Sequence, residues 1–408
     1  MKWLTENLAG TGGIYKQTPE DFQVEEIPLY PCSGGGEHLY LWIEKSGITT
    51  RELLTQLAQG LKLRNHELGY AGLKDARALT RQMISVPSTK FNHLKKLNIH
   101  KAKILNITRH KNKLRLGHLA GNRFTITLRE INAGALSCAV AIIIQLQKQG
   151  VPNFFGEQRY GILGNSARLG QLLVQKKMTE FCQEFIGDPR LILNPGWKKA
   201  AEHYQHGEII AALDNLPKKM RDERRLLQML LNGKSHQTAV SALPRNLLRL
   251  FLSAAQSTFF DQLLKQRLSS LDKFVDGDIA VKHVNGACFR VEHAEEEQFR
   301  ADNFEISPSA PLFGSKVMLA TGEPGKRELE LLKKSGLTLD SWNLSQGLTM
   351  PGERRPLRVP LSDPRIIVHG ESYLTISFAL PKGSYATSVL REVIKDPQLQ
   401  QFMLKNST

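Results

Sequence analysis

The sequence predicts an α+β protein whose sheet is mixed and largely antiparallel. Residues 14–150 alternate between strand-like and helix-like segments, but without the regular strand–helix–strand units of a doubly wound parallel sheet. From about residue 154 the pattern changes to long helical stretches, and strand character returns after about residue 356. We therefore expect a sheet-containing region at each end of the chain and a helix-rich region between them.

The N-terminal elements are predicted in the following order. Residues 14–29 form a strand with a turn at 18–20, and a second strand follows the glycines at 34–36. That second strand is indicated by apolar side chains at alternate positions, namely Leu39, Leu41 and Ile43. A helix then begins at Thr49 or Thr50, with apolar residues at 53, 54, 57 and 61.

The later elements are predicted from the same signals. Residues 81–88 form a strand, residues 101–131 a long hairpin, and residues 134–150 a helix that ends at Gly150. Helices are expected within residues 166–186, 219–233, 244–271 and 325–336. The turn-rich residues 349–365 mark a boundary, and residues 371–395 predict a strand, a turn and a helix.

Positive charge is concentrated in one part of the chain. The net charge is 55 − 39 = +16, and residues 62–129 hold sixteen Lys or Arg but two acids, Glu67 and Asp75. A patch of this kind is typical of a surface that binds the phosphate backbone of a nucleic acid. The alternative, an evenly cationic surface, does not explain why one segment carries nearly all of the excess.

The expected location is the cytoplasm, without a membrane span. The N-terminus has Glu6 and three glycines where a signal peptide needs an unbroken apolar stretch. The longest apolar run, around residues 138–146, is shorter than the roughly 20 residues that cross a bilayer. Four dispersed cysteines without a CxxC pair argue against a structural zinc site and a disulfide framework.

Motif searches leave carboxylate chemistry as the remaining option. The chain has no phosphate-binding glycine loop, no zinc-protease spacing and no GxSxG elbow, so we expect no nucleotide cofactor and no metal. Asp75 lies among Lys74, Arg77 and Arg81, which keep a carboxylate ionised for attack or proton removal at a sugar. The competing interpretation is that Asp75 pairs with Arg77 or Lys74 on a loop surface.

Six ordered stretches resemble the TruD family of tRNA pseudouridine synthases. The stretch around Asp75, "AGLKDARALTRQ" (71–82), is similar to the family's catalytic motif. The other five are "PEDFQVEE" (19–26), "GNRFTITLRE" (121–130), "VPNFFGEQRYG" (151–161), "LSAAQSTFFDQLLKQRL" (252–268) and "LPKGSYATSVLRE" (380–392). The resemblance implies a pseudouridine synthase catalytic domain (residues 1–153 and 357–408) interrupted by a TruD-type insertion domain (154–356).

The resemblance also implies roles for individual residues. Asp75 matches the catalytic carboxylate, and Lys16 and Arg391 are candidates for its basic partner. The positions that match substrate-contacting residues are Phe22, Asn122, Phe124 and Tyr385. Phe124 stands where most other pseudouridine synthase families have a tyrosine. The cations expected to contact the RNA backbone are Lys74, Arg77, Arg81, Lys111, Lys113 and Arg115.

The implied reaction is isomerisation of a uridine in tRNA, typically position 13 of the D-arm, without a cofactor. Asp75 either attacks the sugar or removes a sugar proton, and the sequence leaves both routes open. Phe22 has an alternative role as a core residue and Asn122 as a turn residue. A non-catalytic RNA-binding or RNA-chaperone protein is the second hypothesis, and an RNA methyltransferase the third. A monomer is the default expectation.

Overall fold

The computed structural model describes residues 2–94, 97–345, 347–370 and 372–396. The chain forms two compact units, the first made of Trp3–Val151 and Val359–Asp396, the second of Pro152–Arg358. The predicted boundaries at 153/154 and 356/357 lie two residues from these divisions. In the described part of the chain, no helix is long and apolar enough to cross a membrane.

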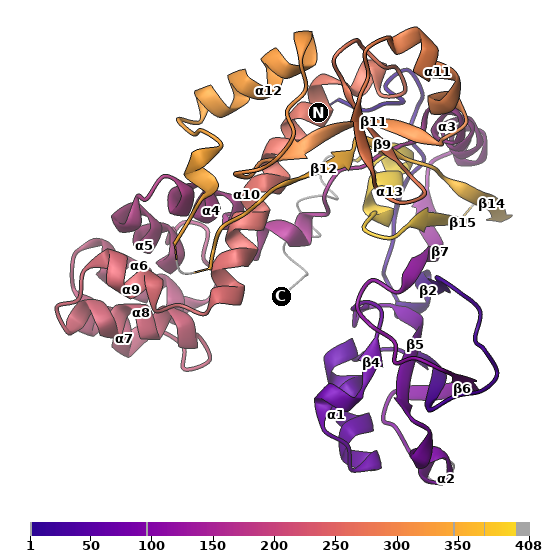
Figure 1. Cartoon of the computed structure of the whole chain (residues 1–408). Helices are drawn as coiled ribbons and strands as arrows, with labels where there is room; N and C mark the ends of the chain where they lie inside the picture. Colours follow the sequence, from indigo (N-terminus) through magenta and orange to yellow (C-terminus); the bar gives the residue numbers. More distant parts are fainter. Residues whose placement is uncertain (1, 95–96, 346, 371, 397–408) are drawn as a thin grey trace. The chain divides into compact units, whose positions relative to one another are not determined.

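The first unit is built on a nine-stranded sheet (Figure 1). Its main strands, in spatial order, are β14 (Ser362–His369), β15 (Tyr373–Pro381), β7 (Leu119–Ile131), β2 (Phe22–Pro28), β5 (Leu79–Pro87), β3 (His38–Lys45) and β6 (Ala102–His110). Two short strands complete it, β1 (Gly12–Ile14) beside β7 and β4 (Gly69–Tyr70) beside β5. The β2–β5 pair is parallel and the other described pairs are antiparallel, so the predicted sheet type is confirmed.

One sequence prediction about this sheet is wrong. Residues 101–131 do not form a hairpin, because β6 pairs with β3 while β7 pairs with β2 and β15. The strand pattern itself was correct, but local sequence does not specify which distant strand a segment will pair with. As a result β7 lies in the middle of the sheet, next to both the N-terminal and the C-terminal segments of the unit.

Helices cover parts of this sheet. They are α1 (Thr50–Leu61), α2 (Phe91–Leu94), α3 (Ala135–Gln149) and α13 (Ala386–Ile394). The α1 helix starts with a capping box in which Thr49 Oγ1 accepts from Glu52 N and Glu52 Oε2 accepts from Thr49 N. Leu53, Leu57 and Leu61 of this helix pack on the apolar face of β3. The α3 helix ends at Gly150 as predicted and lies beside α13 and β14 (Figure 1).

The second unit is rich in helices, as expected. They are α4 (Ser166–Val174), α5 (Met178–Ile186), α6 (Pro195–Gln205), α7 (Ile209–Asn215), α8 (Arg221–Leu231), α9 (His236–Ser241), α10 (Arg245–Gln266), α11 (Ala294–Asp302) and α12 (Gly322–Lys334). The long α10 packs against α4 and α12 (Figure 1). The predicted helical stretch 166–186 is two helices, because Lys176 adopts a left-handed backbone (φ 57°) between α4 and α5.

A four-stranded antiparallel sheet completes the second unit. Its strands are β10 (Cys288–Arg290), β9 (Ile279–Lys282), β11 (Ile306–Leu312) and β12 (Glu353–Pro356). The short strands β8 (Val151–Pro152) and β13 (Arg358–Val359) form a separate two-stranded sheet.

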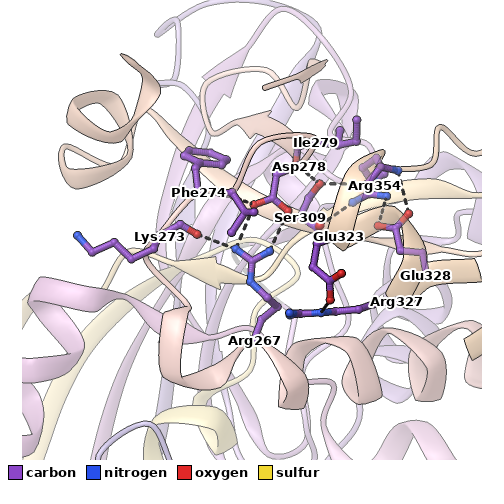
Figure 2. A network of polar contacts seen from close by, with 12 residues as sticks. Arg267, Lys273, Phe274, Asp278, Ile279, Ser309, Glu323, Arg327, Glu328 and Arg354 are labelled. Carbon is purple, nitrogen blue, oxygen red and sulfur yellow. Dashed lines mark hydrogen bonds and ion pairs between the residues drawn. The ribbon is translucent and has the colours of Figure 1, made fainter. Parts of the chain in front are cut away.

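Buried ion pairs connect the four-stranded sheet to helices of the second unit, as Figure 2 shows. Arg267 donates to both carboxylate oxygens of Asp278, at 2.8 and 3.0 Å, and Arg354 Nη1 lies 2.8 Å from Glu328 Oε1. Arg354 also donates to Ser309, which lies on β11. Because these side chains are almost fully buried, each charge depends on its partner for stabilisation.

Candidate active site

Asp75 lies in the segment between β4 and β5, where its carboxylate is held by two donors. The ammonium nitrogen of Lys16 is 2.6 Å from Asp75 Oδ2, and the backbone N–H of Arg77 donates to Oδ1 over 3.1 Å. The Asp75 side chain is 31% exposed, so one part of it faces solvent. The carboxylate is therefore fixed in direction and still accessible to a substrate.

The surroundings of Asp75 keep it ionised. Burial by itself raises the pKa of the Asp75 carboxyl, but the positive charge and hydrogen bond of Lys16 and the backbone N–H of Arg77 outweigh burial. The pKa is therefore below its ordinary value. An ionised carboxylate at neutral pH is the form that attacks a carbon atom or accepts a proton.

Lys16 joins Asp75 to an aromatic cluster. Its backbone is left-handed (φ 60°), and its ammonium nitrogen lies 4.3 Å from the ring centroid of Phe22. Phe22 is 6.2 Å from Phe124 between ring centroids, and both rings are 6% exposed. The structure therefore brings Asp75, Lys16, Phe22 and Phe124 together from three separate segments of the sequence.

Asn122 is held beside this cluster by a buried lysine. Lys74 Nζ donates to Asn122 Oδ1 over 2.6 Å and lies 3.2 Å from Glu26 Oε2. Burial lowers the pKa of Lys74 and raises that of Glu26, while their mutual attraction acts in the opposite direction on each. Because Asn122 lies opposite Glu26 in the β2–β7 register, its amide has a fixed position on the sheet.

Two of the cations near Asp75 in sequence, Lys74 and Arg81, are paired with other acids. The Lys74 side chain is 5% exposed, and its ammonium group pairs with Glu26 and donates to Asn122. It therefore does not fit the role of a phosphate contact. Arg81 forms ion pairs with Glu44 and Glu25. The cation paired with Asp75 is Lys16, one of the two candidates that the resemblance indicated for its basic partner, and it is remote in sequence.

The other predicted RNA contacts are more accessible. Arg77, Lys111 and Arg115 are exposed, and Lys113 is half-buried with its ammonium donating to the carbonyl of His66. Tyr385 immediately precedes α13 and is half-buried, while Arg391 lies in the last turn of that helix. The roles of these residues stay predictions.

Two further charged residues belong to the site and were missed. The Lys45 ammonium donates to the backbone carbonyls of Asp75 (2.9 Å) and Ile48 (2.7 Å), and burial lowers the pKa of Lys45 to about 8 although the charge of Asp75 raises it. Glu26 is the second, because it binds Lys74. Both were detectable, since Lys45 continues the inward alternation of β3 and Glu26 that of β2.

The arrangement has no obvious metal site. Across the described residues, no group of three His, Cys, Asp or Glu side chains is placed to hold a metal ion. The chemistry that the geometry offers is an ionised carboxylate paired with a lysine whose ammonium group also contacts an aromatic ring.

Comparison with known proteins shows to which family the chain belongs. The family model described as "tRNA pseudouridine synthase D (TruD)" matches residues 1–393. The chain belongs to the TruD family. Membership confirms the predicted class, an isomerase that acts as a tRNA pseudouridine synthase.

Individual relatives agree with this assignment. A tRNA pseudouridine synthase D of Syntrophotalea carbinolica is 53% identical over 393 residues, covering 96% of this chain and 98% of the relative. The corresponding protein of Geobacter metallireducens is 47% identical over 395 residues, covering 97% and 98%. A crystal structure described as a putative tRNA pseudouridine synthase D from Methanosarcina mazei superposes with a TM-score of 0.84 at 28% identity, covering 98% of this chain and 97% of that chain, which confirms the α+β fold.

Proposed function

We propose that the chain converts a uridine of tRNA, at position 13 of the D-arm, to pseudouridine, with Asp75 as the reacting carboxylate. The observation that carries the proposal is the ion pair between Lys16 and Asp75, 2.6 Å long and next to the ring of Phe22. A partly exposed carboxylate whose pKa is lowered is ready to react without a separate activation step.

The proposed reaction conserves every atom of the base. The C1′–N1 bond breaks, the base turns while enclosed, and a bond forms between C1′ and C5. N1 gains a proton and C5 loses one. Asp75 either bonds to C1′ or removes a sugar proton, and both routes need its ionised form. Phe22 and Phe124 provide aromatic surface for a base that has been extruded from the RNA stack, and Asn122 provides an amide for a base edge.

The remaining parts of the proposal concern the RNA. Arg77, Lys111 and Arg115 are exposed cations suited to phosphate contacts. Because the substrate is tRNA, we place the activity in the cytoplasm. The insertion unit is assigned no catalytic residue.

The test is to map pseudouridine in an unmodified tRNA transcript by carbodiimide-blocked primer extension. We expect the wild type to modify one D-arm uridine and Asp75→Asn to lose about 10²–10⁴-fold in rate, with tRNA affinity changed by less than about threefold. The matched control is Asp188→Asn, since Asp188 is also 31% exposed and also 2.6 Å from a cation, Arg190, in the second unit. Full activity of Asp75→Asn, or loss of activity in Asp188→Asn, contradicts the assignment. Equal RNA binding with no isomerisation by the wild type favours the RNA-binding hypothesis.

A further inference from the structure

The first unit contains a cavity that the proposed reaction does not use. Its volume is about 260 Å³, and its walls include Glu26, Tyr30, Cys32, Tyr40, Met83 and His118. These residues come from β2, from the loop after it, from β3 and β5, and from the segment before β7. The cavity is smaller than the roughly 300–1,000 Å³ of pockets for drug-sized ligands, and it suits one planar ring system.

Aromatic rings form one side of the cavity and are held in place by hydrogen bonds. Tyr30 Oη lies 2.8 Å from His118 Nδ1, and Tyr40 Oη donates to the carbonyl of Asn112 over 3.0 Å. His110 stacks on Tyr30 with centroids 5.1 Å apart and lies 4.7 Å from Tyr40. These contacts order the rings before any ligand arrives, which reduces the entropy cost of binding.

Glu26 adds an acceptor to an otherwise largely apolar wall. Its side chain is 1% exposed, and Oε1 accepts from Met83 N over 3.3 Å. Oε2 pairs with Lys74 Nζ at 3.2 Å, and as a carboxylate oxygen it has a second lone pair that can accept from another donor. A buried carboxylate oxygen in this state favours a ligand that brings an N–H group.

The charge around the cavity indicates a polyanionic ligand. Lys111 and Arg115 are exposed and lie in the segment that leads to His118, and the Lys382 ammonium donates to Gly117 O over 3.3 Å. Positive charge that tracks a backbone, together with aromatic rings that accept a base, is the usual arrangement in single-stranded nucleic acid sites.

We propose that this cavity binds a second extruded base of the RNA substrate, one with an amino group, which donates to Glu26 and packs on Tyr30. Adenine, cytosine and guanine meet the requirement. Uracil is disfavoured, because two carbonyl oxygens flank its N–H and approach the carboxylate. A base bound in this cavity is connected to the reaction site, because Glu26 pairs with Lys74. Lys74 in turn donates to Asn122 and directly precedes Asp75 in the sequence. The inference rests on the proposed function for its RNA substrate.

Cys32 provides a direct probe, because it lines the cavity and is a free thiol. Alkylation by iodoacetamide at about pH 8.5 is followed by peptide mass spectrometry, with half-buried Cys138 and Cys288 as internal controls. At tRNA about ten times above its Kd, we expect alkylation of Cys32 to slow about tenfold, and that of the two controls to stay unchanged. Unchanged alkylation of Cys32 overturns the proposal.

Mononucleotides separate base binding from simple coverage by RNA. We expect AMP, CMP or GMP to protect Cys32 more than UMP, and ribose 5-phosphate to give no protection. Protection by tRNA but by no mononucleotide means that RNA covers the mouth without inserting a base, which overturns the proposal. Equal protection by UMP overturns the role of Glu26.

A pair of variants tests the consequence for catalysis. Cys32→Trp fills the cavity and is expected to raise KM for tRNA about tenfold, about 1.4 kcal/mol, with kcat unchanged, while Cys32→Ser behaves as the wild type. Thermal unfolding checks that both variants fold. An unchanged KM in Cys32→Trp contradicts the proposal. Protection of Cys32 without pseudouridine formation by the wild type instead refutes the proposed function and leaves the base site standing.

Discussion

Lys16 and Asp75 form an ion pair across 59 residues of sequence, with 2.6 Å between the ammonium nitrogen and Oδ2. Lys16 comes from the segment between β1 and β2, and Asp75 from the segment between β4 and β5. The pairing sets the charge of the carboxylate, since burial without this cation raises the pKa of Asp75. Lys16 is therefore a positioning residue whose removal has a measurable electrostatic consequence.

Lys16→Met is expected to shift the acidic limb of the pH–rate profile to higher pH. In the wild type the lowered pKa keeps Asp75 ionised, and activity is lost only as the pH falls through that low value. Without the cation, burial dominates and the limb shifts up by about 1–3 pH units. Single-turnover rates measured between about pH 4.5 and 8 give the position of this limb. Lys16→Arg, which keeps the charge, is the control, and an unshifted limb in Lys16→Met contradicts the electrostatic role.

The buried pair of Lys74 and Glu26 is expected to matter more for stability than a surface pair. The two side chains are 5% and 1% exposed, so Lys74→Met leaves a buried, unpaired carboxylate and costs about 3–5 kcal/mol. The double variant Lys74→Met/Glu26→Gln removes both charges and is expected to recover part of that loss. Urea unfolding measures the free energy of unfolding of the single and the double variant. Equal losses in the single and double variants are the result that argues against a charge effect.

Local patterns predicted the elements of the fold well and their pairing less well. The alternation of Leu39, Leu41 and Ile43 located β3, and the capped amphipathic pattern located α1. The pattern of residues 101–131 predicted a hairpin, an arrangement in which strands adjacent in sequence pair with each other. The two strands instead pair elsewhere, β7 with segments more than 90 residues before it and more than 240 after it. Long-range pairing depends on the packing of the whole sheet, which a local pattern does not contain.

In the candidate site, too, a single residue was identifiable from the sequence, but the partners of its neighbours were not. Asp75 was identifiable as one of two acids in a basic segment and by its motif. The expectation that Lys74 and Arg81 supply the local field was wrong, because acids on neighbouring strands, Glu26 for Lys74 and Glu44 for Arg81, bind those cations. The inward position of Lys45 was visible in the strand alternation, but its bond to the Asp75 carbonyl depends on the loop conformation.

Lys45 is expected to make stability rise with pH in the alkaline range. Its pKa is about 8 in the folded protein and 10.5 as the ordinary value, so between these values the unfolded chain binds more protons and folding is increasingly favoured as pH rises. Relative to Lys45→Met, the wild type should gain up to about 1.4 kcal/mol per pH unit between pH 8 and 10. Urea unfolding of both proteins at several pH values measures this difference. Parallel pH dependences for the two proteins rule out a depressed pKa at Lys45.

The second unit is expected to depend on the buried pair of Arg267 and Asp278 (Figure 2). Arg267→Met leaves Asp278, 2% exposed, with its backbone donor Val275 N but without its cation, and should destabilise the unit by about 3–5 kcal/mol. Arg327→Met is the matched control, because Arg327 pairs with the exposed Glu323 at i,i+4 spacing and its loss costs about 0.3–0.5 kcal/mol.

Hydrogen exchange measured by mass spectrometry locates the effect of this last change. Arg267→Met is expected to accelerate exchange in α10 and β9, since Arg267 directly follows α10 and Asp278 directly precedes β9. Peptides from β2 and β7 should exchange at wild-type rates, because they belong to the other compact unit and we expect each unit to open by itself. Equal acceleration in both units instead shows that they unfold as one cooperative structure, and a wild-type pattern in α10 shows that the ion pair contributes nothing to its stability.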